Sequence, residues 1–276
     1  MSLDELFQQI KKKKSFLCVG LDVDIDKLPS TLSPNPGSIF EFSKQIIDAV
    51  APYAVAIKPN LAFFEVYGSK GWEILELLMN YIDNNYPELF TIADAKRGDI
   101  GTSSEKYAHA FFKHLKFNAV TVSPYMGQDS VEPFLMYPDK HVILLSSTSN
   151  PGSQDFQIQS GNENNLFEKV IQKSQTWSHS EKLWYVVGAT RSSHLKQIRK
   201  LVPHNYLLVP GIGVQGGHLS DVVEYGINEQ CGLIVNASRS IIYSSNGSDF
   251  AHAAMTRARS LQFGMESFLK KHELVK

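Results

Sequence analysis

Short apolar runs recur along the chain, and each is apolar at nearly every position. Strands that are covered on both faces show this pattern, because neither side of the strand meets water. Between the runs, apolar residues recur every three or four positions, as in residues 39–50, 72–82 and 166–171, which predicts amphipathic helices. The predicted strands are residues 16–21, 54–58, 90–95, 119–123, 141–146, 183–188, 206–209 and 233–236.

The regular alternation of strand and helix predicts the fold class. Eight repeats in roughly 250 residues are typical of a (β/α)8 TIM barrel, an α/β fold whose active site lies at the carboxyl-terminal face of the strands. A doubly wound sheet usually has fewer strands and a G-x-G-x-x-G turn after its first strand, which this sequence lacks. We expect one catalytic domain over residues 1–276, with an N-terminal helix in 1–15 and a C-terminal helix in 261–276.

Composition narrows the classes of partner. The chain is 43% hydrophobic and 20% charged, and its 27 Lys and Arg against 28 Asp and Glu give a formal net charge of -1. This balance predicts no nucleic-acid or anionic-membrane partner. The N-terminus is acidic first, unlike a signal peptide, and no apolar run approaches the ~18 residues of a membrane span. The two cysteines, Cys18 and Cys231, have apolar neighbours, which favours reduced, buried thiols and a cytoplasmic protein.

Charged residues gather at the end of the third predicted strand. Asp94 and Lys96 are two residues apart, so strand alternation predicts that they share a face. Asp99 follows in a loop that contains Gly98 and Gly101. A lysine between two carboxylates stays protonated, because opposite charge favours its charged form. The arrangement therefore predicts a prepared proton donor.

Other predicted strands also end in polar residues: Asp22 after the first, Lys58 in the second, Ser149 after the fifth, Gln215 and Gly216 after the seventh, and Ser238 and Arg239 after the eighth. In a barrel these ends meet at one face. The glycine-rich loop around Gly216 permits close backbone approach, and the Arg239 guanidinium can hold an anion at two points. These two neighbouring loops together predict a phosphate site.

The segment from Asp94 to Ile100 resembles the Asp-x-Lys-x-x-Asp signature of the orotidine 5′-monophosphate decarboxylase family. Asp22, Lys58, the Ser149-Asn-Pro-Gly segment, Gln215 and Arg239 fall in the family's order. The resemblance runs from about residue 16 to about residue 242. The residues of its motifs are most similar to those of the longer bacterial subgroup.

That resemblance implies decarboxylation of orotidine 5′-monophosphate to uridine 5′-monophosphate and CO2 in pyrimidine biosynthesis, with no cofactor and no metal. It implies a catalytic array of Lys58, Asp94, Lys96 and Asp99, in which Lys96 donates the proton. It also implies a homodimer in which Asp99, Ile100 and Ser103 reach the partner's site. The implied substrate-binding residues are Asp22, Ile100, Ser103, Ser149, Gln215, Gly216, Ser238 and Arg239.

Two other functions stay open from the residues alone. Sugar-phosphate lyases of the same superfamily share the signature and act through a metal-stabilised enediolate. Lys58 argues against them, because a protonated lysine repels a divalent cation. A barrel that only binds a nucleotide or serves as a scaffold is the third interpretation. Clustered like charges cost stability, so the intact set of Asp94, Lys96 and Asp99 favours an enzyme.

Overall fold

The described residues form a closed parallel barrel, in which the strands follow one another in chain order. The computed structural model describes residues 1–158, 165–190, 192–212 and 218–276. The strands are β1 (Leu17–Leu21), β2 (Ala56–Pro59), β3 (Phe90–Arg97), β4 (Ala119–Val122), β5 (His141–Ser147), β6 (Leu183–Val187), β7 (Leu207–Pro210) and β8 (Leu233–Ala237). The α/β barrel that the hydrophobic pattern predicts is therefore confirmed, and each predicted run contains most of one strand.

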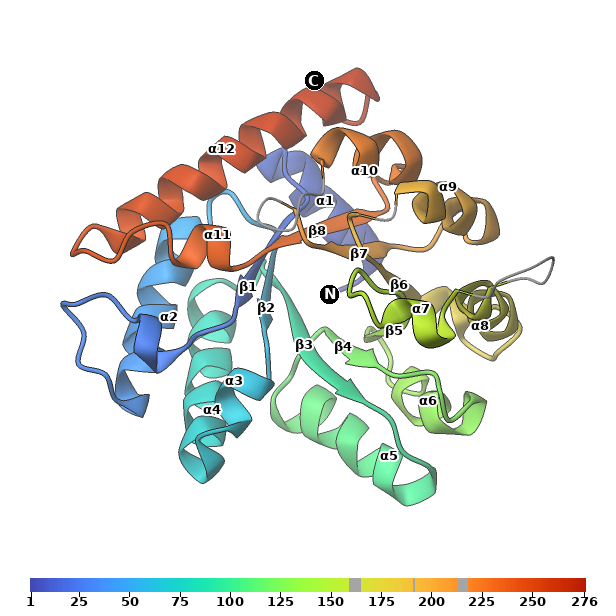
Figure 1. The fold of residues 1–276 in the computed structure, drawn as a ribbon, viewed down its shortest axis with the longest axis horizontal. Helices are drawn as coiled ribbons and strands as arrows, with labels where there is room; N and C mark the ends of the chain where they lie inside the picture. Colours follow the sequence, from blue (N-terminus) through green and yellow to red (C-terminus); the bar gives the residue numbers. More distant parts are fainter. Residues whose placement is uncertain (159–164, 191, 213–217) are drawn as a thin grey trace. The chain divides into compact units, whose positions relative to one another are not determined.

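Helices separate the strands along the chain (Figure 1). They are α1 (Leu3–Lys13), α2 (Pro36–Val50), α3 (Ala62–Glu65), α4 (Gly68–Asn85), α5 (Gly101–His109), α6 (Gln128–Leu135), α7 (Ser153–Phe156), α8 (Leu166–Ser174), α9 (Ser192–Leu201), α10 (Leu219–Gly226), α11 (Arg239–Ile242) and α12 (Phe250–Lys271). A capping box between Ser2 and Glu5 starts α1, inside the predicted N-terminal helix. Helix α12 starts well before residue 261, because Phe250, Ala254 and Ala258 extend its buried stripe.

The strands are buried along nearly their whole length, as their composition predicts. All five residues of β1 and all four of β2 are buried. The two strands pair in parallel, with Cys18 opposite Ala56 and Leu21 opposite Pro59. This register places the carboxyl ends of β1 and β2 side by side, so residues that follow them belong to one face.

Contacts divide the chain into two compact units. Unit 1 comprises residues 1–95, 115–117 and 236–276, and unit 2 comprises residues 96–114 and 118–235. In unit 1, α2 packs against both α4 and α12, and Figure 1 shows α12 running past α11. In unit 2, α5 packs on α6 and α9 on α10. The expectation of a single domain over 1–276 stays a prediction.

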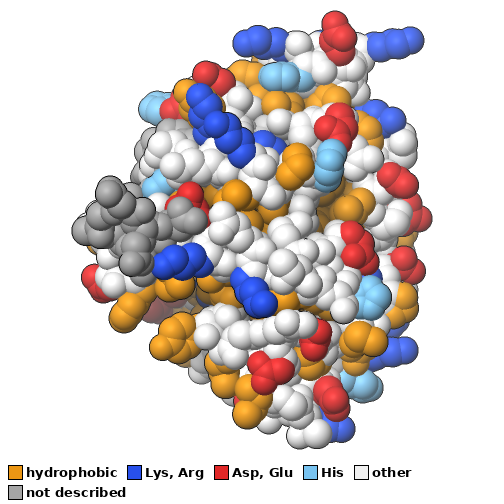
Figure 2. Space-filling view, turned by 90° about the vertical axis from the view of Figure 1, so that its right-hand side faces the viewer, with side chains coloured by type: hydrophobic (Ala, Val, Ile, Leu, Met, Phe, Trp, Pro, Cys, Tyr) orange, Lys and Arg blue, Asp and Glu red, His pale blue; other side chains and the backbone are white. Residues whose placement is uncertain are grey.

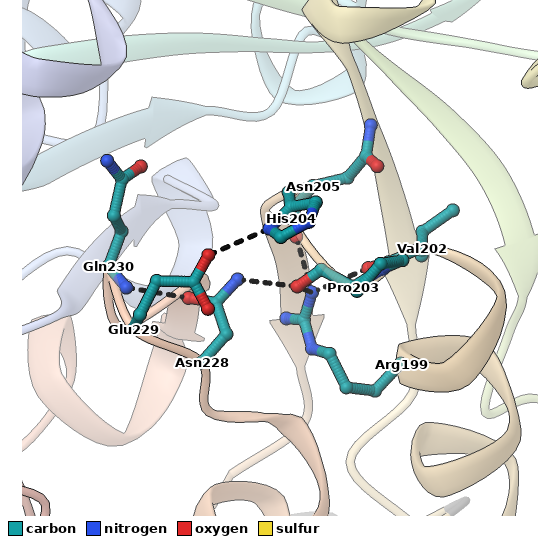
Figure 3. A network of polar contacts seen from close by, with 8 residues as sticks. All are labelled: Arg199, Val202, Pro203, His204, Asn205, Asn228, Glu229 and Gln230. Atoms are coloured by element: carbon teal, nitrogen blue, oxygen red, sulfur yellow. Dashed lines mark hydrogen bonds and ion pairs between the residues drawn. The ribbon is translucent and has the colours of Figure 1, made fainter.

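Arg199 ties together the amino-terminal ends of β7 and β8 in unit 2. Figure 3 shows its side chain beside the turn that precedes β7. The side chain leaves α9, and it donates five hydrogen bonds to backbone carbonyl oxygens. The acceptors are those of Val202, Pro203, Asn205, Gly226 and Gly232, at 2.7–3.3 Å. Burial lowers the pKa of Arg199 to about 10, which leaves the group charged at neutral pH.

Polar side chains extend this network in Figure 3. Asn228 donates from Nδ2 to the Pro203 carbonyl at 2.9 Å, and its Oδ1 accepts from the Gln230 amide at 3.0 Å. At the surface, His204 Nδ1 lies 2.7 Å from a carboxylate oxygen of Glu229. One guanidinium and one amide thus satisfy the carbonyls of three separate turns.

Side chains of both charge signs lie among hydrophobic ones on the face drawn in Figure 2. That face therefore shows mixed charge rather than one extended basic surface. Among the described residues, no helix combines the length and the hydropathy that crossing a membrane requires.

Candidate active site

A buried ion pair joins β2 to β3 in unit 1. The Lys58 Nζ lies 2.6 Å from the Asp94 Oδ2, and Lys58 is only 4% exposed. Burial alone would lower the pKa of Lys58, but the charges of Asp94 and Asp22 outweigh it, and the net result is a raised pKa. Lys58 is therefore a charged ammonium held against a carboxylate inside the fold.

Two side-chain oxygens close to strand ends in unit 1 are buried without a donor. Asp22 Oδ1 and Asn236 Oδ1 have no hydrogen-bond partner among the described residues. Asn236 lies in β8, is 6% exposed, and donates from Nδ2 to Ser238 Oγ at 3.1 Å. A buried acceptor left unpaired costs about 1–3 kcal/mol, and a substrate hydroxyl or a water could satisfy it.

Asn236 was not among the predicted site residues. The signal was present, because a polar amide ends the apolar run Leu233–Val235. Strand alternation could not separate a structural amide from a binding one. The buried, unpaired oxygen makes the difference.

Gly20 allows β1 to approach the segment after β8. A Cβ built on Gly20 would lie 2.0 Å from Ser238 Oγ and 3.1 Å from Asn236 Oδ1, so any larger residue there would displace the Ser238 side chain. Ser238 directly precedes α11, and the exposed Arg239 begins that helix. Gln215 and Gly216, the other predicted phosphate ligands, lie outside the described residues.

Lys96 belongs to unit 2, and its backbone is unusual. Its φ of 49° lies in the left-handed region, which costs a non-glycine residue roughly 1–3 kcal/mol. The Lys96 amide donates to Thr121 Oγ1 on β4 at 2.9 Å, which helps to hold this conformation. Because alternation applies to extended residues, it does not by itself set the direction of this exposed side chain.

The other predicted residues of unit 2 lie after β3 and β5. Asp99 accepts a hydrogen bond from the Ile100 amide at 2.8 Å. Ile100 is 53% exposed, and Ser103 is exposed on α5. Ser149 follows β5 and is half-buried. The structure brings Lys58 and Asp94 together in unit 1, close enough to Asp22 for its charge to act on Lys58. Ser238 and Arg239 also belong to unit 1, and the predicted residues of unit 2 are Lys96, Asp99, Ile100, Ser103 and Ser149.

The two cysteines are buried and unbridged, as predicted. Burial raises the pKa of both Cys18 and Cys231 to about 12, so neither forms a thiolate nucleophile at neutral pH. Within residues 1–158, 165–190, 192–212 and 218–276, no cluster of three or more His, Cys, Asp or Glu side chains could hold a metal ion.

Known proteins are similar to this chain over nearly its full length. The model of the Orotidine 5'-phosphate decarboxylase / HUMPS family matches residues 15–254. An orotidine 5'-phosphate decarboxylase of Flavobacterium johnsoniae is 54% identical over 269 residues, which cover 98% of each chain. One from Porphyromonas gingivalis W83 is 54% identical over 276 residues and 100% of each chain. The structure of Leishmania donovani OMP decarboxylase is 34% identical, has a TM-score of 0.80, and covers 95% of this chain and 100% of its own.

The family model covers most of the chain, and the relatives match it end to end at more than half identity. The resemblance seen in the sequence is therefore confirmed. This chain belongs to the orotidine 5′-phosphate decarboxylase / HUMPS family.

Proposed function

We propose that this chain decarboxylates orotidine 5′-monophosphate to uridine 5′-monophosphate and CO2 in pyrimidine biosynthesis. The observation that carries the proposal is the buried pair of Lys58 and Asp94 at the ends of β2 and β3, in a chain of this family. Bacterial relatives at 54% identity bear the name of this activity. A protonated Lys58 also disfavours the metal-dependent lyases of the superfamily, because it would repel a divalent cation.

In the proposed mechanism, Lys96 is the general acid. The bond between the pyrimidine ring and the carboxylate breaks, CO2 leaves, and the electron pair stays on the ring carbon. The Lys96 ammonium stabilises that negative charge and then transfers a proton to the carbon. Solvent returns the proton to the amine after product release.

The carboxylates and Lys58 would preorganise this step. Asp94 would lie beside the departing carboxylate, while Lys58 would hold Asp94 and reach the ribose. The buried Asp22 Oδ1 would accept a hydrogen bond from a ribose hydroxyl. Gln215, Gly216, Ser238 and Arg239 would hold the phosphate, and Ser149 would contact the pyrimidine. Remote binding of the phosphate can stabilise the charged array that the reaction needs.

The proposal includes a homodimer in which Asp99, Ile100 and Ser103 reach the partner's site. Exposed apolar side chains on two loops of unit 2 support it: Ile100 is 53% exposed, Tyr125 89% and Met126 47%. Mixing a Lys58→Ala variant with an Asp99→Ala variant should restore activity, because the hybrid dimer contains one site with both native residues. No restoration in a mixture that has exchanged subunits would place Asp99 in its own subunit's site. The cytoplasmic location stays a prediction.

The direct test follows the loss of orotidine monophosphate absorbance, with and without a chelator. We expect chelator-resistant turnover that falls by roughly 10²–10⁴-fold in Lys96→Ala, the usual contribution of a positioned acid. Lys200→Ala, at an exposed lysine on α9, is the matched control and should keep full activity. A folded wild type that leaves this nucleotide intact would overturn the proposal. Loss of turnover with the chelator would favour a metal-dependent lyase.

A further inference from the structure

The carboxyl end of β5 contains a β-bulge. Leu145 pairs with Val186 of β6, but the next pair joins Ser147 to Val187, so Ser146 is the extra residue. The Ser146 hydroxyl donates to the Val186 carbonyl at 2.7 Å, which stabilises the irregular pairing. A bulge of this kind re-aims the side chain that follows it, and bulges are frequent beside active sites.

The residue after the bulge contacts a histidine on another element. Ser147 Oγ lies 2.8 Å from His194 Nδ1, and Ser147 is only 1% exposed. The His194 ring stacks on Phe167 of α8, with centroids 4.7 Å apart and planes at 26°. The stacking fixes the ring, and the ring nitrogen then fixes the serine hydroxyl.

Ser149 lies two residues beyond Ser147, and it is held from the side of β6. The Gly188 amide donates to the Ser147 carbonyl at 2.8 Å. A Cβ on Gly188 would lie 2.8 Å from the Ser149 nitrogen, so Ser149 packs directly on that glycine. Between them, Thr148 donates from its amide to Gln157 Oε1 at 2.8 Å. The short segment from Ser147 to Ser149 therefore has a defined path.

A serine beside a histidine can also be an activated nucleophile. That interpretation fails here, because a hydroxyl on a side chain that is 1% exposed is closed to a substrate. The contact between Ser147 and His194 can therefore act only by positioning the residues next to it in the chain.

We propose that His194 is a positioning residue that, through Ser147, sets Ser149 against the pyrimidine of the substrate. The inference rests on the proposed function and adds to it a residue that controls how Ser149 contacts the pyrimidine. His194 contacts Ser147 and Phe167. Because Ser149 is the residue proposed to meet the pyrimidine, the effect of His194 should be specific to ligands that carry a base.

Three variants test the contact. His194→Phe keeps a ring that can stack on Phe167 but removes the nitrogen, and Ser147→Ala removes the hydroxyl. His194→Asn places an amide close to the position of Nδ1, where it can donate or accept. The control is His252→Phe, the same substitution at an exposed histidine on α12.

The readout is competitive inhibition by uridine monophosphate, which has a base, and by ribose 5-phosphate, which lacks one. We expect His194→Phe and Ser147→Ala to weaken the first by on the order of tenfold and to leave the second unchanged. The double variant should be no weaker than either single variant, and His194→Asn should recover most of the loss. Adding Ser149→Ala to His194→Phe should cost little more.

Equal weakening of both inhibitors, or of neither, would overturn the positioning role. Additive effects of Ser147→Ala and His194→Phe would overturn it as well. If the wild type fails to consume orotidine monophosphate, the proposed function fails instead. Direct binding of uridine monophosphate and ribose 5-phosphate to the same variants still decides the positioning role in that case.

Discussion

Two groups of polar atoms in this molecule are treated in opposite ways. Around Arg199, at the amino-terminal ends of β7 and β8, one guanidinium donates to five carbonyl oxygens. Around Lys58 in unit 1, Asp22 and Asn236 each bury an oxygen that has no donor within the described residues. In barrels of this fold, the amino-terminal face of the strands usually serves stability, and the carboxyl-terminal face usually holds the active site. The unsatisfied acceptors of Asp22 and Asn236 are atoms that a bound ligand could satisfy.

The largest expected effect would separate function from stability at Lys58. Lys58→Met alone should abolish most turnover, by roughly 10³-fold, and should destabilise the fold by about 3–5 kcal/mol, because the half-buried Asp94 loses the ammonium that lies 2.6 Å from its Oδ2. The double variant Lys58→Met/Asp94→Leu should be equally inactive yet close to the wild type in stability. Urea unfolding and the absorbance assay measure the two quantities. A double variant as unstable as the single one would mean that the pair serves the fold.

Arg199→Lys should give the converse result. A lysine cannot donate to carbonyls of three separate turns, so we expect a loss of about 3 kcal/mol in the free energy of unfolding. The kcat/KM of the protein that remains folded should not change, because Arg199 donates to backbone carbonyls at the amino-terminal ends of strands. Arg259→Lys, at an exposed arginine on α12, is the matched control and should stay within about 0.5 kcal/mol. A fall in kcat/KM of fully folded Arg199→Lys would show that the Arg199 network serves the reaction as well as the fold.

Asn236→Leu should test whether the unpaired acceptors near Lys58 serve ligand binding rather than the fold. Removing the buried, unpaired oxygen should stabilise the free protein by about 1 kcal/mol, but the same change removes the hydrogen bond from Nδ2 to Ser238 Oγ. We therefore expect the free energy of unfolding to stay within about 1 kcal/mol of the wild type. The same change should weaken substrate binding if the amide contacts the ligand. Thermal unfolding with and without uridine monophosphate gives both numbers. A destabilised variant with normal ligand binding would show that Asn236 serves packing alone.

A further prediction concerns pH and the thiol of Cys18. Burial raises its pKa from 9.0 to about 12, so the native state binds a proton that the unfolded state releases above pH 9. This stabilising contribution is complete below pH 9 and is lost as the pH rises toward 12. The difference in unfolding free energy between wild type and Cys18→Ala should therefore shrink over that interval. A difference that is constant between pH 8 and 11 would contradict the buried thiol.

The barrel is predictable from the sequence, because the spacing of apolar residues and the burial of each strand are local properties of the chain. Strands such as β1 are buried at every position, and an apolar run reports that directly. The start of α12 is harder to predict, since Ala254 and Ala258 are small and contribute little to an apolar pattern. The positions of Lys58 and Asp94 at one face are also predictable, because the carboxyl ends of the strands of a TIM barrel all lie at the same face.

The finer features of the site depend on contacts that no pattern in one sequence contains. Asn236 acquires its importance from an unpaired oxygen, and His194 from the bulge that turns Ser147 toward it. Alternation also misses the backbone of Lys96, where a single left-handed residue interrupts the extended strand. Side-chain type is visible in a sequence, but the direction of a side chain at a strand end is not.

The left-handed backbone of Lys96 has a consequence for how this position tolerates change. Glycine and asparagine adopt that conformation most easily, whereas valine and isoleucine resist it. A library of all amino acids at position 96, sorted for folded protein alone, should therefore enrich glycine and asparagine over lysine. The same library sorted for growth without external pyrimidine should return lysine. At this residue, selection for the reaction would maintain a side chain that selection for the fold would discard.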